Sequence, residues 1–213
     1  MKRHIAKIRP GVAHLRKNDP VIGDLIRRCP PVTSMTLEPN RFKMLVHSIL
    51  SQQISVHAAR AIRGRLTELA GARGMKPDTI ASLDTDQLRE IGVSRVKAGY
   101  LKDLAERVAS GQIQLNQIGR RKDEVAIQEL TQVKGIGVWT AQMFLIFSLG
   151  RLDVFPHDDY GVRSAIRNLY ALDELPDRTE SHTIAAPWHP YATIATWYLW
   201  RSHELKQKSA GGN

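Results

Sequence analysis

The residue types best suited to chemistry lie in two segments of the C-terminal half of the chain. The segment "VKGIGVWT" (133–140) places two glycines one residue apart inside an apolar helical pattern. Glycine inside a helix costs about 1 kcal/mol relative to alanine, so the pair indicates a forced turn or a close backbone approach. Further along, "DVFPHDDYG" (153–161) carries the acidic pair Asp158 and Asp159 where a helix should begin. One carboxylate would suffice to cap that helix, so the pair suggests a further role.

The two glycines predict a tight hairpin between helices. Gly135 can adopt a positive φ and close one helix, while Gly137 leaves the first amides of the next helix open to an anion. Lys134 adds a positive charge at this turn, and Thr140 adds a hydroxyl donor. Since the net charge is +10, a DNA phosphate is the natural anion. The glycines alone leave open an ordinary, tightly packed helix–helix turn.

The elements that must position these segments are helices, and the periodicity predicts an all-α chain. Residues suited to capping a helix precede apolar stripes at Asp19, Asn40, Ser55 and Ser94. Later helices are expected at about 124–131, 138–149, 159–170 and 190–204. No run shows the two-residue alternation of a strand, and the last residues, 206–213, are expected to be frayed.

Composition excludes several classes of site. The single cysteine, Cys29, excludes an internal disulfide and any iron–sulfur or zinc site built on several cysteines, and a buried structural thiol is expected. No apolar run reaches membrane-spanning length, and no signal-peptide core follows the basic N-terminus. We therefore expect no membrane partner and a cytoplasmic, nucleoid-associated protein, or a nuclear one in a eukaryote. A monomer is also expected.

Several segments together resemble a known family. "LTQVKGIGVWTAQMFLIFSLGRLDVFPHDDYGVR" is similar to the helix-hairpin-helix motif and the Gly/Pro-rich loop with its Asp in DNA glycosylases, and "FKMLVHSILSQQISVHAARAI" resembles a segment of their alkylation-repair branch. The resemblance runs from Asp19 to Arg201 and is greatest to 3-methyladenine DNA glycosylases II, in a compact form without an N-terminal β domain. It implies one domain, 1–213, with two helical lobes around a cleft. We expect the lobes at about 35–112 and at 113–205 together with helix 19–29.

The resemblance implies a monofunctional DNA glycosylase of base excision repair. Such an enzyme would hydrolyse the N-glycosidic bond of alkylated purines, chiefly 3-methyladenine and 7-methylguanine. The family's catalytic aspartate falls on Asp159, which would stabilise an oxocarbenium-like transition state and assist water, while Asp158 would cap the helix or orient the loop. Alkylated purines already carry positive charge, so they leave without a strong general acid. Trp139 occupies the position at which bifunctional relatives carry a nucleophilic lysine, which implies that the abasic strand is left intact.

The base pocket implied by the family contains Trp139, Met143, Tyr160 and Trp188. An electron-rich indole at Trp139 would stack on a cationic purine, and a core tryptophan is the alternative. Met143 replaces an aromatic wall of some relatives, and Ala192 stands where an arginine is common. These two departures imply a narrower or shifted substrate range.

The partner implied by the family is double-stranded DNA containing alkylated bases. Gln53 lies where sister families insert a side chain into the base stack, although helix capping or structural bonding is an alternative. Ser55 and His57 lie close to it in sequence. Further DNA contacts are expected from Lys134, Gly135, Gly137, Thr140 and Arg163, with Arg95 and Lys97 as additional candidates. No catalytic cofactor is expected, but the backbone carbonyls of Thr131, Val133 and Gly135 could hold a structural Na⁺ or K⁺.

Two alternative functions stay open from the sequence. One is a glycosylase for neutral lesions such as ethenoadenine or hypoxanthine, which would need hydrogen bonds to the base that no residue clearly supplies. The other is a helix-hairpin-helix module that binds DNA without chemistry. Asp159 and the bulky Trp139 argue against such a module, because binding alone needs neither.

Overall fold

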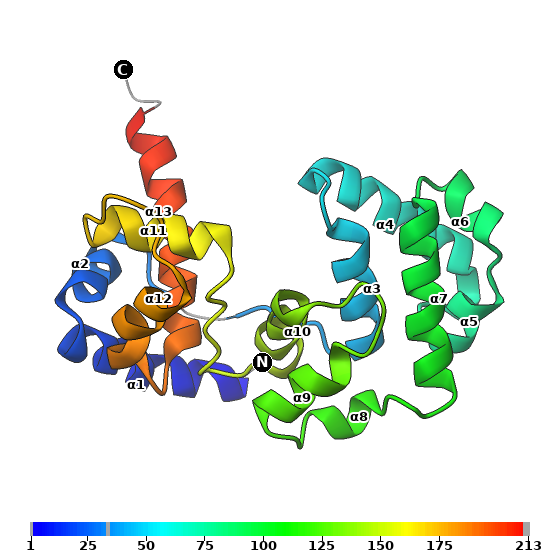
Figure 1. Ribbon diagram of the computed structural model, residues 1–213, viewed down its shortest axis with the longest axis horizontal. Coiled ribbons are helices and arrows are strands. Elements are labelled where there is room, and N and C mark those ends of the chain that lie inside the picture. The colour runs from blue at the N-terminus through cyan, green and yellow to red at the C-terminus, as the bar shows by residue number, and fades with distance from the viewer. Residues whose placement is uncertain (1, 33–34, 211–213) are drawn as a thin grey trace. The chain divides into compact units, whose positions relative to one another are not determined.

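A computed structural model describes residues 2–32 and 35–210, which form helices and contain no β-strand (Figure 1). The expected all-α fold is confirmed. The chain divides into two compact units. Unit 1 comprises Met1–Leu37 and Gly150–Asn213, and unit 2 comprises Glu38–Leu149.

This division corrects the expected boundary between the lobes. Residues 113–149 were expected with the C-terminal segment, but they belong to unit 2. The physical reason is packing, because α8 (Leu115–Ile118) and α10 (Val138–Phe144) both pack on α3 (Arg41–Ser51). The hairpin is therefore built on the same core as the Gln53 segment.

Unit 1 is assembled from the two ends of the chain. Its helices are α1 (Lys2–Asn18), α2 (Pro20–Arg28), α11 (Tyr160–Leu169), α12 (Arg178–Ala185) and α13 (Ala192–Ala210), with a 3-10 turn at Ala186–Trp188. The long helix α13 packs against α1, α2 and α11. Apolar side chains such as Leu25, Ile166 and Leu199 are fully buried there. This core fixes α11, the helix that begins beside Asp159.

A buried carboxylate ties several elements of unit 1 together. Asp19 is 5% exposed, and its Oδ1 accepts from the amides of Val21 and Ile22 at 2.9 and 3.0 Å, as expected for an N-cap of α2. Its Oδ2 accepts from Trp188 Nε1 at 2.7 Å and from the Tyr170 hydroxyl. Burial and the neighbouring Asp19 raise the pKa of Tyr170. A buried charge is tolerated here because each oxygen has donors.

Unit 2 is a set of helices around α3 and α7. It contains α3 (Arg41–Ser51), α4 (Val56–Ala70), a 3-10 turn (Gly71–Arg73), α5 (Pro77–Ser82), α6 (Thr85–Glu90), α7 (Arg95–Ala109), α8 (Leu115–Ile118), α9 (Asp123–Leu130), α10 (Val138–Phe144) and a π-helical turn (Leu145–Leu149). The expected N-caps are confirmed: Asn40, Ser55 and Ser94 each accept from the amide three residues on. Among the helices of unit 2, α7 packs against α3 and α5.

Some elements differ from the sequence-based expectation. The periodicity did not predict α1, which contains Pro10, or α12. The apolar helix expected to Leu149 ends at Phe144 and continues as the π-helical turn. At the C-terminus α13 continues to Ala210, so only residues 211–213 of the expected frayed tail lie outside the described residues. No helix in the described ranges combines the length and apolar character needed to cross a membrane.

Candidate functional site

Asp159 is the N-cap of α11. Its Oδ1 accepts from the Val162 amide at 2.8 Å and from Trp200 Nε1 at 3.0 Å. The expectation that Asp158 caps this helix is therefore wrong, because Asp159 does so itself. The Asp158 side chain is 63% exposed, and its Oδ2 lies 3.2 Å from His157 Nε2. The two carboxylates of the pair thus have different surroundings.

Helix α13 fixes the position of the Asp159 carboxylate. Trp200, on α13, supplies the indole donor, and α13 crosses and packs against α11 in unit 1 (Figure 1). A Cβ at Gly161 would lie 3.1 Å from Asp159 Oδ1 and 3.4 Å from Trp200 Cδ1. His203 Nε2 lies 2.8 Å from the Gly161 carbonyl oxygen. Gly161 therefore leaves the space in which the carboxylate and the indole meet.

The role of Trp200 was missed in the sequence. "WHPYATIATWYLW" (188–200) was noted only for its resemblance, and nothing in it pairs Trp200 with a residue 41 positions earlier. Tertiary packing alone makes this contact. Chemically, a carboxylate held by an indole and a backbone amide presents a fixed negative charge that can stabilise a developing cation without reorganisation.

The other pocket residues predicted in unit 1 lie in contrasting places. Tyr160 is 71% exposed. Trp188 has no exposed surface, and its indole is engaged by Asp19 and packs edge-on against Phe155. This corrects the expectation for Trp188, because a core side chain with its donor satisfied does not present a face to a base. Trp188 is therefore part of the core of unit 1 and not of a base pocket.

The two hairpin glycines of unit 2 are needed for different reasons. Gly135 has a φ of +81°, and a Cβ there would overlap the ring of Tyr100. Gly137 has a φ of −87°, is exposed, and has nothing within 4 Å of the position of its Cβ. Gly135 thus makes the turn against a tyrosine ring. Gly137 keeps the surface at the start of α10 open.

Of the other hairpin residues, Lys134 is exposed and Thr140 is not. The Lys134 amide donates to Asp103 Oδ2 at 2.9 Å, which holds the backbone while the side chain reaches solvent. Thr140 is 3% exposed. Its hydroxyl therefore does not reach the surface, and the expectation that Thr140 contacts phosphate is corrected.

The segment after α3 presents Gln53 in a special conformation. Gln53 has a φ of +53° and is exposed. Non-glycine residues in the left-handed region are uncommon, and such conformations cluster at functional sites. Ser55 caps α4 by accepting from the Ala58 amide at 3.2 Å, so Gln53 does not have that capping role. His57 is exposed on the first turn of α4.

Two cationic residues that were candidates for phosphate contacts bind main-chain carbonyls. Lys97 Nζ donates to Leu50 O at 2.9 Å and to Gln52 O at 2.6 Å, and burial lowers the pKa of Lys97. Arg163 Nε donates to Pro176 O at 2.9 Å. The expectation for Lys97 is corrected, because two main-chain carbonyls hold its ammonium group. The guanidinium of Arg163 has further N–H donors besides Nε, so its phosphate contact stays a prediction. Arg95 is exposed.

The predicted pocket residues of unit 2 lie on successive turns of α10. Trp139 is 41% exposed, so it is not a core tryptophan, while Met143 is 6% exposed. An exposed indole next to the hairpin offers a stacking surface of the kind that flipped bases use. A stacking role for Trp139 stays a prediction.

The carbonyls proposed for a cation belong to the hairpin. Val133 O accepts from the Ile136 amide at 3.0 Å, and Gly135 O accepts from Gln52 Nε2 at 2.8 Å. Each carbonyl oxygen retains a second lone pair, so the donor set is compatible with a weakly held monovalent ion. Among the described residues, no group of three or more His, Cys, Asp or Glu side chains is placed to hold a metal.

Comparison with known proteins identifies the family. The model of the HhH-GPD superfamily of base excision DNA repair proteins matches residues 46–190, more than half of the chain. The chain belongs to the HhH-GPD superfamily. The matched range contains the Gln53 segment, the hairpin and Asp159.

Relatives of this HhH-GPD protein are found among curated sequences and solved structures. DNA-3-methyladenine glycosylase 1 of Schizosaccharomyces pombe is 36% identical over 166 residues, which cover 77% of this chain and 73% of that protein. YfjP of Bacillus subtilis is 33% identical over 178 residues, covering 81% of this chain but 62% of YfjP, less than two thirds of its length. The structure of S. pombe 3-methyladenine DNA glycosylase (Mag1) with abasic DNA has a TM-score of 0.83 at 32% identity, covering 92% and 97% of the two chains.

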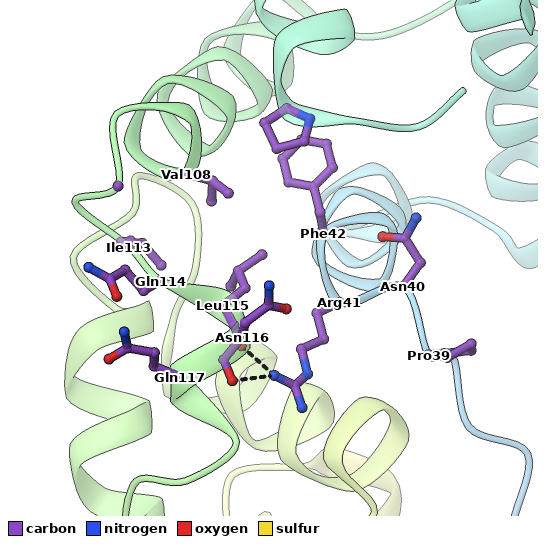
Figure 2. Close-up of a pocket in the computed structure, with 12 residues that line it drawn as sticks. Pro39, Asn40, Arg41, Phe42, Val108, Ile113, Gln114, Leu115, Asn116 and Gln117 are labelled. Carbon is purple, nitrogen blue, oxygen red and sulfur yellow. Dashed lines mark hydrogen bonds between the residues drawn. The ribbon is translucent and has the colours of Figure 1, made fainter. Parts of the chain in front are cut away.

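A pocket of about 540 Å³ in unit 2 of the HhH-GPD protein contains none of the predicted site residues. Figure 2 shows Arg41 reaching across it, where Arg41 Nη1 donates to Leu115 O at 2.7 Å and to Asn116 O at 3.0 Å. The guanidinium joins the start of α3 to α8 there. Its visible role is structural.

Proposed function

We propose that this chain is a monofunctional DNA glycosylase that removes alkylated purines from double-stranded DNA as a monomer. The observation that carries the proposal is the Asp159 carboxylate, fixed at the start of α11 by the Val162 amide and the Trp200 indole. It is supported by membership of a base excision repair superfamily and by similarity to proteins named as 3-methyladenine glycosylases.

The chemistry follows from the charge of the substrate and of Asp159. In an N3- or N7-alkylated purine, the base carries a positive charge and leaves with the electron pair of the N-glycosidic bond, becoming neutral. Positive charge then develops on the deoxyribose, as in other glycoside cleavages. The fixed Asp159 carboxylate stabilises this charge and orients the water that attacks the sugar. The water proton is released to solvent or to the carboxylate, and an intact abasic strand remains.

DNA binding is assigned to the exposed groups of unit 2. The backbone at Gly135 and Gly137 and the Lys134 side chain would hold a phosphate. His57, exposed on the first turn of α4, would add a further contact. Gln53 would fill the vacancy left by the extruded nucleotide. A sodium or potassium ion held by the carbonyls of Thr131, Val133 and Gly135 would add positive charge beside that phosphate. The buried Thr140 has no place in this assignment, and Arg163 of unit 1 stays a candidate for a phosphate contact.

Trp139 supports both the substrate class and the monofunctional outcome. Its exposed indole would attract a cationic base more strongly than a neutral one, through stacking and cation–π interaction. A tryptophan side chain cannot form the covalent sugar intermediate that an amine forms. Cleavage of the strand by this chain is therefore not expected.

The proposal is tested by release of methylated purines from alkylated duplex DNA. Asp159→Asn keeps an acceptor for the Val162 amide and so keeps the helix cap, but it removes the charge. We expect at least a hundredfold loss of release, on the scale for lost electrostatic stabilisation. Asp158→Asn is the matched control, because that side chain is 63% exposed, and it should retain activity.

Other outcomes of the same assay would exclude the proposal. Equal release by the wild type and Asp159→Asn would remove Asp159 from the reaction, and strand breaks without alkali would contradict the monofunctional outcome. If the wild type binds DNA but releases no methylated purine, oligonucleotides with ethenoadenine or hypoxanthine would separate a neutral-lesion enzyme from a binding module.

A further inference from the structure

One face of α7 contacts both segments of unit 2 assigned to DNA. Lys97, Tyr100 and Asp103 recur every three residues along α7, so they lie on one side of the helix. Lys97 binds the segment that carries Gln53, and Tyr100 and Asp103 contact the hairpin. The same rigid helix thus supports two loops that are far apart in the sequence.

Lys97 holds the end of α3 at the point where the chain turns into Gln53. Its ammonium donates to Leu50 O and Gln52 O at 2.9 and 2.6 Å. These carbonyls end a helix, so they have no partner within it, and a positive charge is favourable there. The next residue adopts the left-handed φ of +53°. Such a conformation persists only where its surroundings fix it.

Gln52 joins this segment directly to the hairpin. Its Nε2 donates to Gly135 O at 2.8 Å, while its own carbonyl accepts from Lys97. On the hairpin side, the Tyr100 ring packs against Gly135 and Asp103 Oδ2 accepts from the Lys134 amide at 2.9 Å. Asp103 is held in turn by Arg107 at 3.0 Å.

We propose that Lys97 and Gln52 are positioning residues that join segment 51–55 and hairpin 133–137 into one rigid DNA-gripping element. The inference rests on the proposed function. Unstacking a nucleotide costs a few kcal/mol, which contacts with the protein must offset. The inserted side chain can make such contacts only if it is held at a fixed distance from the bound phosphate. If segment 51–55 were mobile, phosphate binding would stay intact, but the inserted Gln53 side chain would not stabilise the extruded nucleotide.

The test compares Lys97→Met with Lys102→Met. The control removes the same charge from the same helix, at a side chain that makes no hydrogen bond or ion pair to the residues that the structure describes. Base release is measured under single-turnover conditions on a lesion in a duplex and on the same lesion in an unpaired bulge. Lys97→Met should lose roughly tenfold to hundredfold on the duplex, the range for a lost charge-assisted hydrogen bond. The loss should be much smaller on the bulge, where the base is already unstacked. Lys97→Arg, which can also donate to two carbonyls, should restore activity.

A double-mutant cycle separates this role from a merely structural one. In a chain that already carries Gln53→Ala, adding Lys97→Met should cause little further loss, because the side chain that it positions is absent. Gln52→Leu should behave like Lys97→Met. Independent losses in the cycle, equal losses on duplex and bulge, or wild-type behaviour of Lys97→Met would overturn the proposal.

The failure of the proposed function is distinguishable from that of the inference. A wild type that releases no base from alkylated DNA would overturn the proposed function alone. Insertion can then be followed without chemistry, by the fluorescence of 2-aminopurine placed next to an abasic analogue in the duplex. The inference predicts that Lys97→Met reduces the fluorescence change at saturating protein, and an unchanged signal would overturn it. Thermal melting of each variant shows whether it is folded.

Discussion

At the scale of single residues, the properties of the candidate site come from what surrounds Asp159. The carboxylate is placed by a backbone amide of its own helix and by Trp200 from another helix. Gly161 lies beside both groups, and an added methyl would contact Asp159 Oδ1 at 3.1 Å. The space at Gly161 is thus part of what positions the Asp159 carboxylate, although glycine itself has no side chain.

Gly161→Ala should separate stability from activity. Alanine favours a helix over glycine by about 1 kcal/mol, so the melting temperature should stay equal or rise. The new methyl should displace the carboxylate by a few tenths of an ångström and reduce the turnover of base release roughly three- to tenfold. Gly64→Ala, on α4 with nothing within 4 Å, is the control and should raise stability with no loss of activity. Turnover of Gly161→Ala equal to that of the wild type would show that the reaction does not depend on the position of Asp159 on this scale.

At the scale of elements, the hairpin needs a glycine at two positions for different reasons: one lets the turn pack against Tyr100, and the other keeps the start of α10 open to solvent. Gly135 turns the chain against Tyr100 with a positive φ, and Gly137 faces open space. The shared α7 face then ties the hairpin to the end of α3. Stability and DNA binding should therefore respond to different glycines of the same motif.

Gly135→Ala should lower the stability of the fold, whereas Gly137→Ala should weaken DNA binding. At Gly135 the left-handed conformation and the contact with Tyr100 should together lower the free energy of unfolding by about 2 kcal/mol or more. At Gly137 the free energy of unfolding should change by less than about 0.5 kcal/mol, but a methyl over the amides should weaken DNA binding about tenfold. Urea unfolding and a DNA titration of each variant measure both quantities. Equal effects of the two substitutions on stability would contradict this assignment.

At the scale of the whole molecule, the dominant long-range property is the net charge of +10. Lysine and arginine side chains that neutralise phosphates release counterions, so affinity for DNA should fall steeply with salt. This electrostatic contribution to affinity depends neither on the DNA sequence nor on the lesion. This attraction acts at long range, whereas the roles proposed for Asp159 and Gln53 act only at the lesion.

Lys134→Met should reduce the salt dependence of DNA binding by about one unit in the slope of log K against log salt, if one phosphate contact is lost. Lys76→Met, an exposed lysine at the start of α5, should leave the slope unchanged. Fluorescence anisotropy with labelled undamaged duplex at several salt concentrations measures both slopes. Identical slopes for the wild type and Lys134→Met would remove Lys134 from the phosphate contact.

The sequence by itself determined the local structure and the identity of the motifs. The caps at Asp19, Asn40, Ser55 and Ser94 and the positive φ of Gly135 follow from side-chain chemistry within a few residues, so they were predictable. The family was recognisable for the same reason, because its motifs are short and contiguous.

Only the tertiary structure decided which partners these residues have. Trp200 reaches Asp159 across 41 positions, and Gln52 reaches Gly135 across 83. Trp188, Thr140 and Lys97 were predicted to be site residues from their positions in the sequence. In the structure Trp188 and Thr140 are buried, and Lys97 donates to main-chain carbonyls. Contacts between distant segments depend on how helices pack, which periodicity within one helix does not encode.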